Sequence, residues 1–197
     1  MSYTVLNSAL SSTLLSDPEV AGLFSADADL VAMLDFEAAL AEAEAEAGVF
    51  SSRLAQQIAA ACRGFRPDMV RLDAGISRDG MAVPDLVAQL REAIGTEASK
   101  YLHFGATSQD VIDTSLTSRL QRVNQILEPR LLNVCASLAH LDKRFGTHQL
   151  MARTRMQSAL PILAGHRIHS WRAPLLDLSD DFGQIQIAVH ALQFGGP

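Results

Sequence analysis

Four polar residues, Thr-Ser-Gln-Asp, occupy positions 107–110 and precede the longest amphipathic segment of the chain. Short side chains that accept hydrogen bonds are typical of helix starts. Thr107 and Asp110 approximate a capping box, with Asp where Glu or Gln is usual. Two kinds of chemistry fit this position. The side chains can cap the helix, or its first N–H groups and the positive end of its dipole can bind an anion. Spacing alone favours capping and leaves the anion site open.

A second group of polar residues lies in the segment Leu150–Pro161, which we expect to be a turn followed by a helix start. It carries two cations, Arg153 and Arg155, together with Thr154 and Gln157. Solvated arginines in a turn are common, so the pattern by itself favours a structural interpretation. The alternative is that this segment binds an anionic substrate, because guanidinium groups pair well with carboxylates.

His103 is the histidine closest to the polar run at 107–110. Two interpretations stay open for it: a supporting role in binding or proton transfer, and a buried histidine with its hydrogen bonds satisfied. His166 and His169 share a helix face without a carboxylate at ligand spacing, so the helical face explains them better than a metal site. We expect neither a metal nor a cofactor.

Composition restricts the class of protein. The 197 residues are 48% hydrophobic and 19% charged, which indicates a globular chain, and the net charge of -6 argues against nucleic acid as the main partner. Cys62 and Cys135 show no metal-binding spacing and are expected to be free thiols in a reducing compartment. No apolar run approaches the ~18 residues of a membrane span. Residues 1–12 lack the features of a signal peptide, so we expect a cytoplasmic location without membrane contact.

The elements that must position these residues are predicted to be helices throughout. In residues 1–109 the apolar spacing indicates an N-terminal helical domain. A short helix is expected to begin at residues 66–68, and Gly75–Gly80 is expected to be a loop. The other helices of this domain are expected at Pro18–Ser25, Asp27–Phe50, Ser51–Phe65 and Pro84–Ile94.

Residues 110–197 are predicted to form the first part of a long-helix bundle. Apolar residues step by three or four from Asp110 to Phe145, and a second long helix is expected over Gln157–His190. Pro129 and Pro174 are expected to bend these helices. Helices of ~50 Å are too long for a monomer of this size. Their apolar stripes therefore predict an oligomer.

The run Gly105–Thr114, preceded by His103, resembles the first signature of the fumarase/aspartase superfamily. The second signature of that superfamily, usually Thr-His-x-Gln, corresponds to residues 154–157, where Arg155 replaces the histidine that takes part in proton transfer in the lyases. The lactonizing members also lack this histidine. They are further similar at Phe36–Gly48 and Leu192–Gly196.

The resemblance implies lactonization of the tricarboxylate 3-carboxy-cis,cis-muconate to 4-carboxymuconolactone, a step in the catabolism of aromatic compounds. It assigns catalytic roles to His103, Ser108 and Arg155. It also implies a homotetramer whose active sites are shared between subunits, with no cofactor. The residues expected to bind substrate are Thr107, Gln109, Arg153, Thr154 and Gln157.

The third signature, a loop of the type Ser-Ser-x-Met-Pro-x-Lys-x-Asn-Pro, does not occur in these residues. We therefore expect this chain to be the N-terminal part of a longer enzyme and to be inactive or nearly so by itself. Two alternatives remain. One is a lyase acting on adenylosuccinate or argininosuccinate, which Arg155 disfavours, and the other is a non-catalytic helical oligomerisation module.

Overall fold

The computed structural model describes residues 16–189 and 191–195, which fall into two compact units. Unit 1 extends to Leu120 and includes the chain from His190 onward, and unit 2 covers Gln121–Val189. The expectations for residues 1–12, for His190 and for residues 196–197 lie outside the described residues. The domain boundary expected between residues 109 and 110 stays a prediction.

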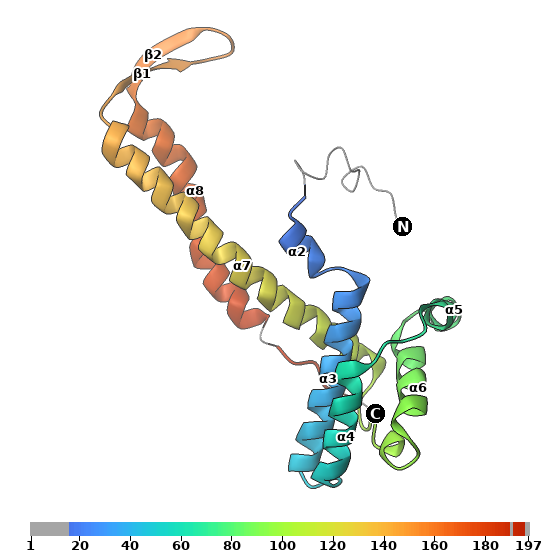
Figure 1. Ribbon diagram of the computed structural model, residues 1–197. Coiled ribbons are helices and arrows are strands. Elements are labelled where there is room, and N and C mark those ends of the chain that lie inside the picture. The colour runs from blue at the N-terminus through green and yellow to red at the C-terminus, as the bar shows by residue number, and fades with distance from the viewer. Residues whose placement is uncertain (1–15, 190, 196–197) are drawn as a thin grey trace. The chain divides into compact units, whose positions relative to one another are not determined.

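Unit 1 is helical, and the predicted all-α class is confirmed. Local signals explain where its helices begin: Asp17 accepts hydrogen bonds from the N–H groups of Glu19 and Val20, and Ser25 accepts one from Ala28. The elements of unit 1 (Figure 1) are α2 (Pro18–Gly22), α3 (Ala26–Glu46), α4 (Ser52–Gly64), α5 (Met69–Asp79), α6 (Val83–Ile94), the 3₁₀ helix η2 (Ala98–Lys100) and the first part of α7 (Ser108–Phe145).

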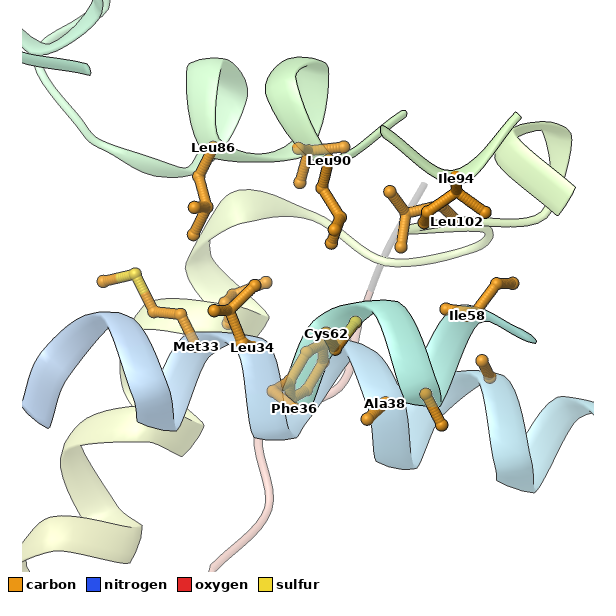
Figure 2. Close-up of a cluster of buried hydrophobic side chains, with 14 of the residues drawn as sticks. Met33, Leu34, Phe36, Ala38, Ile58, Cys62, Leu86, Leu90, Ile94 and Leu102 are labelled. Carbon is orange, nitrogen blue, oxygen red and sulfur yellow. The ribbon is translucent and has the colours of Figure 1, made fainter. Parts of the chain in front are cut away.

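The core of unit 1 lies where α3 and α4 pack together and α6 covers them. Ile58 and Leu90 are completely buried there, and Figure 2 shows the side chains of α6 facing those of α3 and α4. Small residues permit the close approach of α3 and α4, because an alanine methyl group takes up little space between the two backbones. The buried alanines of α3 and α4 are Ala38, Ala41, Ala55 and Ala59.

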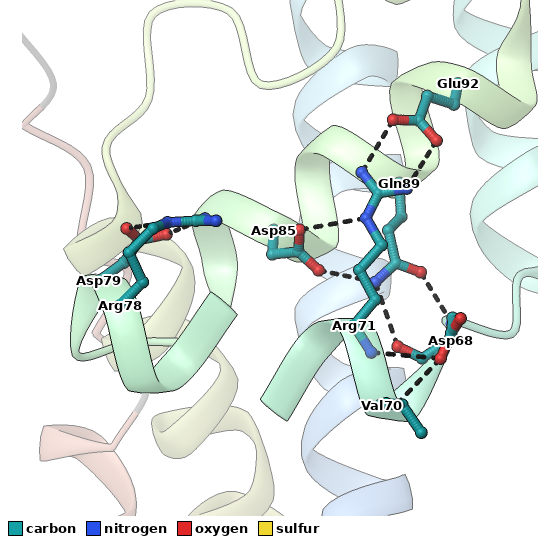
Figure 3. A network of polar contacts seen from close by, with 8 residues as sticks. All are labelled: Asp68, Val70, Arg71, Arg78, Asp79, Asp85, Gln89 and Glu92. Atoms are coloured by element: carbon teal, nitrogen blue, oxygen red, sulfur yellow. Dashed lines mark hydrogen bonds and ion pairs between the residues drawn. The ribbon is translucent and has the colours of Figure 1, made fainter. Parts of the chain in front are cut away.

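A polar network joins α5 to α6 (Figure 3). The Arg71 guanidinium donates to both carboxylate oxygens of Glu92 at 2.7 and 2.8 Å and lies 3.4 Å from the buried Asp85 carboxylate. The Gln89 amide donates to Asp85 at 2.7 Å. The network fixes the side of unit 1 formed by α5 and α6.

The loop predicted over Gly75–Gly80 is wrong, because α5 continues to Asp79 and ends with Gly80 at φ 75°. Gly75 is a packing residue. A Cβ atom at this position would lie 2.6 Å from the Cβ atom of Asp85. Glycine is therefore required by the close contact between α5 and α6.

Unit 2 contains the second part of α7, a two-stranded antiparallel hairpin and α8 (Ala164–Ala188). The strands are β1 (Gln149–Arg153) and β2 (Ser158–Leu163), and Figure 1 shows the hairpin between the ends of the two helices. The prediction of a helix from Gln157 is wrong over its first seven residues, which belong to the hairpin turn and to β2. Pro161 pairs with Met151 in this ribbon. A proline fits there because an edge strand leaves some N–H groups unpaired.

Few side chains are buried within unit 2. Among its described residues only Val123, Asn124, Cys135 and Ile168 are classed as buried. Large apolar side chains are exposed along α7 and α8, including Leu132, Trp171, Leu178 and Ile187. None of the helices in the described part of the chain is long and apolar enough to cross a membrane.

Candidate active site

The polar run at 107–110 forms the start of α7. Gly105 takes the left-handed conformation at φ 66°, and the helix begins at Ser108. The Thr107 N–H donates to Asp110 Oδ2 at 2.9 Å, and the Asp110 N–H donates to the Thr107 carbonyl at 3.0 Å. This is the half of a capping box in which the third helical residue reaches back to the cap. The predicted helix start is confirmed.

Asp110 also ties a distant segment to this helix start. Its side chain is fully buried, and Oδ1 accepts the Gly195 N–H at 3.0 Å. Residues 191–195 thereby run beside the first turns of α7, with alternate residues of the segment meeting successive turns of the helix. The contacts are Asp110 with Gly195, Thr114 with Gln193 in both directions, and Thr117 with Ala191. Two stretches that carry the family resemblance therefore meet in unit 1.

The remaining side chains of the run are available for a ligand. Thr107 and Ser108 are half-buried, and their hydroxyl groups make no hydrogen bond to another described residue. Gln109 is exposed and donates to Asp113 at 2.6 Å. Hydroxyl groups beside a helix N-terminus can hold a carboxylate, because the N–H groups and the helix dipole favour negative charge.

His103 lies against α3. Its Nδ1 is 2.6 Å from Oε1 of Glu37, its side chain is 14% exposed, and its backbone adopts φ 57°. A left-handed conformation is uncommon for residues other than glycine, and such residues cluster at functional sites. Both interpretations of His103 keep support, because one nitrogen is satisfied by Glu37 while the ring is still partly open.

Glu37 is a site residue that the sequence analysis does not single out, although it lies within the stretch Phe36–Gly48 that carries part of the resemblance. Its side chain is 1% exposed, and Oε2 has no partner among the described residues. Burial and the charge of Glu37 raise the pKa of the Glu44 carboxyl. Burial, with a smaller effect of Glu37, raises the pKa of the Cys62 thiol to about 12. The sequence signal for Glu37 is its spacing, since this acid lies on the same helical face as the buried Leu30, Leu34 and Ala41.

The second polar group lies at the tip of the hairpin in unit 2. The Thr154 N–H donates to the Gln157 carbonyl at 3.0 Å, and Met156 takes φ 63° to complete the turn. Arg153, Thr154, Arg155 and Gln157 are all exposed, and neither arginine pairs with an acid in the described ranges. The tip therefore presents two cations and two polar side chains to the surroundings.

The structure places the predicted residues in two groups, one in each unit. His103, Thr107, Ser108 and Gln109 belong to unit 1, and residues 153–157 belong to unit 2. A cavity of about 370 Å³ in unit 1, lined by Leu30, Phe65 and neighbouring residues, contains none of them. No cluster of three metal-binding side chains occurs among residues 16–189 and 191–195. The individual roles stay predictions.

The described helices, the capped start of α7 and the apolar side chains exposed along α7 and α8 place this chain among the all-α proteins. The model of the Lyase family matches residues 15–196. The chain belongs to this family, within the fumarase/aspartase superfamily.

Named relatives agree with this assignment. A 3-carboxy-cis,cis-muconate cycloisomerase of Pseudomonas aeruginosa is 34% identical over 177 residues, covering 88% of this chain and 39% of the relative. An adenylosuccinate lyase of Methanothermobacter thermautotrophicus is 34% identical over 157 residues, covering 78% and 34%. The crystal structure of the 3-carboxy-cis,cis-muconate lactonizing enzyme from Pseudomonas putida matches with a TM-score of 0.86 and 34% identity, covering 91% of this chain and 42% of that one. The chain thus spans about two fifths of the length of the curated cycloisomerases it matches.

Proposed function

We propose that this chain contributes to the intramolecular lactonization of 3-carboxy-cis,cis-muconate to 4-carboxymuconolactone. The observation that carries the proposal is Arg155 at the hairpin tip, where lyases of the superfamily have histidine. It occurs in a chain that is 34% identical to a 3-carboxy-cis,cis-muconate cycloisomerase. An arginine at this position suits binding of a carboxylate and does not suit proton abstraction, since guanidinium stays protonated.

The substrate chemistry fits both groups of residues. Three carboxylates need several cations or N–H dipoles in a site from which water is excluded. Arg153 and Arg155 supply charge, and the start of α7 supplies a helix dipole with the hydroxyl groups of Thr107 and Ser108. Gln109, Thr154 and Gln157 add hydrogen-bonding groups that orient the remaining carboxylates.

The reaction requires little covalent participation by the protein. A carboxylate of the substrate adds across a double bond of the same molecule, so the nucleophile is internal and its effective concentration is set by the bound conformation. Charge that develops on the neighbouring carboxylate is stabilised by Arg155 and by the helix start with Ser108. One proton must reach the carbon next to that carboxylate, and His103 delivers or positions it.

The assembly we propose is a homotetramer with shared binding sites. Only four residues are buried in the described part of unit 2, so most of its apolar side chains pack against nothing within that unit. Further copies of the chain would cover the exposed apolar residues of α7 and α8 and would bring hairpin tips to the helix starts of other copies.

Thermal-shift titration tests the proposal. We expect 3-carboxy-cis,cis-muconate to raise the unfolding temperature, because a ligand that binds only the native state stabilises it by mass action. The stabilisation should disappear in Arg155→Ala. It should persist in Arg167→Ala, which removes an exposed arginine of α8 outside both groups.

The same titration tests the second candidate function, that of an adenylosuccinate lyase. The 34% identical adenylosuccinate lyase of Methanothermobacter thermautotrophicus supports this candidate. Stabilisation by adenylosuccinate without stabilisation by the muconate would favour the lyase over the cycloisomerase. A response to neither ligand, with unchanged behaviour of Arg155→Ala, would leave a non-catalytic helical module as the better description.

A further inference from the structure

Glu37 is a charged group in the apolar core of unit 1. Its side chain is 1% exposed and sits among Leu34, Ala38 and Ala41 on the packed face of α3. Taking a carboxylate out of water is costly, and an apolar residue of similar size is often at least as stabilising at such a position. The packing of α3 therefore gives no reason for an acid here, and the reason lies in its partner among the described residues, His103.

The backbone at His103 is itself held in place. Leu102 is buried in the core, and its carbonyl accepts a hydrogen bond from Arg91 at 3.0 Å. The next residue, His103, turns into the left-handed conformation at φ 57°, and its Nδ1 meets Glu37 Oε1 at 2.6 Å. The backbone thus directs the imidazole onto a carboxylate that comes from another helix, 66 residues earlier in the chain.

Of the two ring nitrogens of His103, only Nδ1 is hydrogen-bonded to a described residue. Nε2 of His103 makes no hydrogen bond to any residue within the described ranges, and the side chain is 14% exposed. Full burial of both ring nitrogens would have indicated a purely structural histidine. An open Nε2, with Nδ1 fixed by a buried acid, is the arrangement that sets the tautomer and the aim of an imidazole that transfers protons.

We infer that Glu37 is a positioning residue for His103: it accepts a hydrogen bond from Nδ1–H and directs Nε2 at a bound carboxylate ligand. The protonated ring donates Nε2–H to that ligand, and after this proton has left, the neutral ring keeps its proton on Nδ1 and Nε2 can accept one. The nature of that ligand rests on the proposed function, whereas the pairing rests on the geometry alone. Glu46 provides the matched comparison. It is an exposed acid of the same helix and makes no bond to His103.

Nitrogen NMR of the histidine ring tests the inference. In the whole chain labelled with ¹⁵N-histidine, the resonances of His103 are assigned by their loss in His103→Gln. We expect the neutral wild-type ring to carry its proton on Nδ1, and the non-reactive tricarboxylate tricarballylate to shift Nε2 while Nδ1 stays fixed. In Glu37→Gln the amide can donate as well as accept, so the ring should populate both tautomers. The apparent Kd for tricarballylate should then rise about tenfold, as expected when a charged hydrogen-bond partner is lost.

Glu46→Gln should leave the tautomer and the Kd unchanged. A wild-type proton on Nε2 overturns the inference and does not depend on whether Glu37→Gln folds. An unchanged tautomer and Kd in a folded Glu37→Gln variant overturn it as well. A proton on Nδ1 with no response to tricarballylate supports the pairing and counts against the proposed ligand, so the two failures are distinguishable.

Discussion

The start of α7 is held by buried contacts within unit 1, whereas the β1–β2 hairpin of unit 2 is exposed along most of its length. Asp110 is fully buried and accepts two backbone N–H groups, and His103 is fixed by Glu37. At the hairpin tip, Arg155 has no acidic partner in the described part of the chain and Met156 is 94% exposed.

This difference shows that the two groups of predicted residues obtain their fixed geometry in different ways. The helix start is preorganised by its own unit, so the ligand that we propose for it would meet fixed groups there and lose little affinity to ordering them. The hairpin tip gains fixed geometry only from something that packs against it. We therefore propose that a site combining the two forms in an assembly of several copies.

The largest expected effect separates the core of unit 1 from the hairpin surface. Ile58→Ala should lower the free energy of unfolding by about 3 kcal/mol, because it empties a completely buried site between α3 and α4. Leu160→Ala, at a side chain that is 77% exposed, should change it by less than about 0.5 kcal/mol in dilute protein. Urea denaturation measures both. A large loss at Leu160 in dilute protein would contradict the description of the hairpin as unsupported.

A smaller effect is expected from the link between α7 and residues 191–195. Asp110→Ala should cost about 2 kcal/mol, since it removes a buried acceptor of two N–H groups. It should also speed hydrogen exchange at the Gly195 amide. Asp113→Ala, which removes a contact to exposed Gln109, serves as the control and should leave exchange at Gly195 unchanged. Equal exchange in all three proteins would show that Asp110 does not hold the segment.

The smallest pair of effects compares two left-handed residues, one from each unit. Gly105→Ala should destabilise the chain by about 1 kcal/mol through backbone strain at φ 66°. Steric conflict is not the cause, because the nearest atom to an added Cβ is 3.9 Å away. Met156→Gly should do the reverse and stabilise the turn by about 0.5 kcal/mol, since φ 63° suits glycine. Thermal unfolding checks the opposite signs, and a loss of stability in Met156→Gly would show that the methionine side chain has a partner.

Local patterns were sufficient for most helices. The helix expected at Pro84–Ile94 is α6, and the helix expected to begin at Pro18 begins there behind its cap Asp17, because such signals act within a few residues. Gly75 was misread because a glycine required by packing looks like a loop glycine in the sequence. Pro161 was misread because proline suits both the first turn of a helix and an edge strand.

The site was predictable only in part, for a related reason. The helix start at 107–110 is a local feature, and it was found. The partner of His103 is not local, since Glu37 lies 66 residues away and the pairing depends on the packing of α3. The link between Asp110 and Gly195 spans 85 residues. Tertiary contacts of this kind leave no spacing signal in one sequence.

A mixing experiment tests most directly whether different copies supply the two halves of one carboxylate site. Ser108→Asp and Arg155→Glu each place a negative charge in one half, so neither variant alone should be stabilised by 3-carboxy-cis,cis-muconate, while the wild type should be. When the two variants are unfolded, mixed equally and refolded together, about a quarter of the shared sites should combine an intact Ser108 with an intact Arg155 and bind the ligand. Recovery of ligand binding to that level is the predicted result. A mixture as inert as either variant, beside a wild type that binds, would contradict the account.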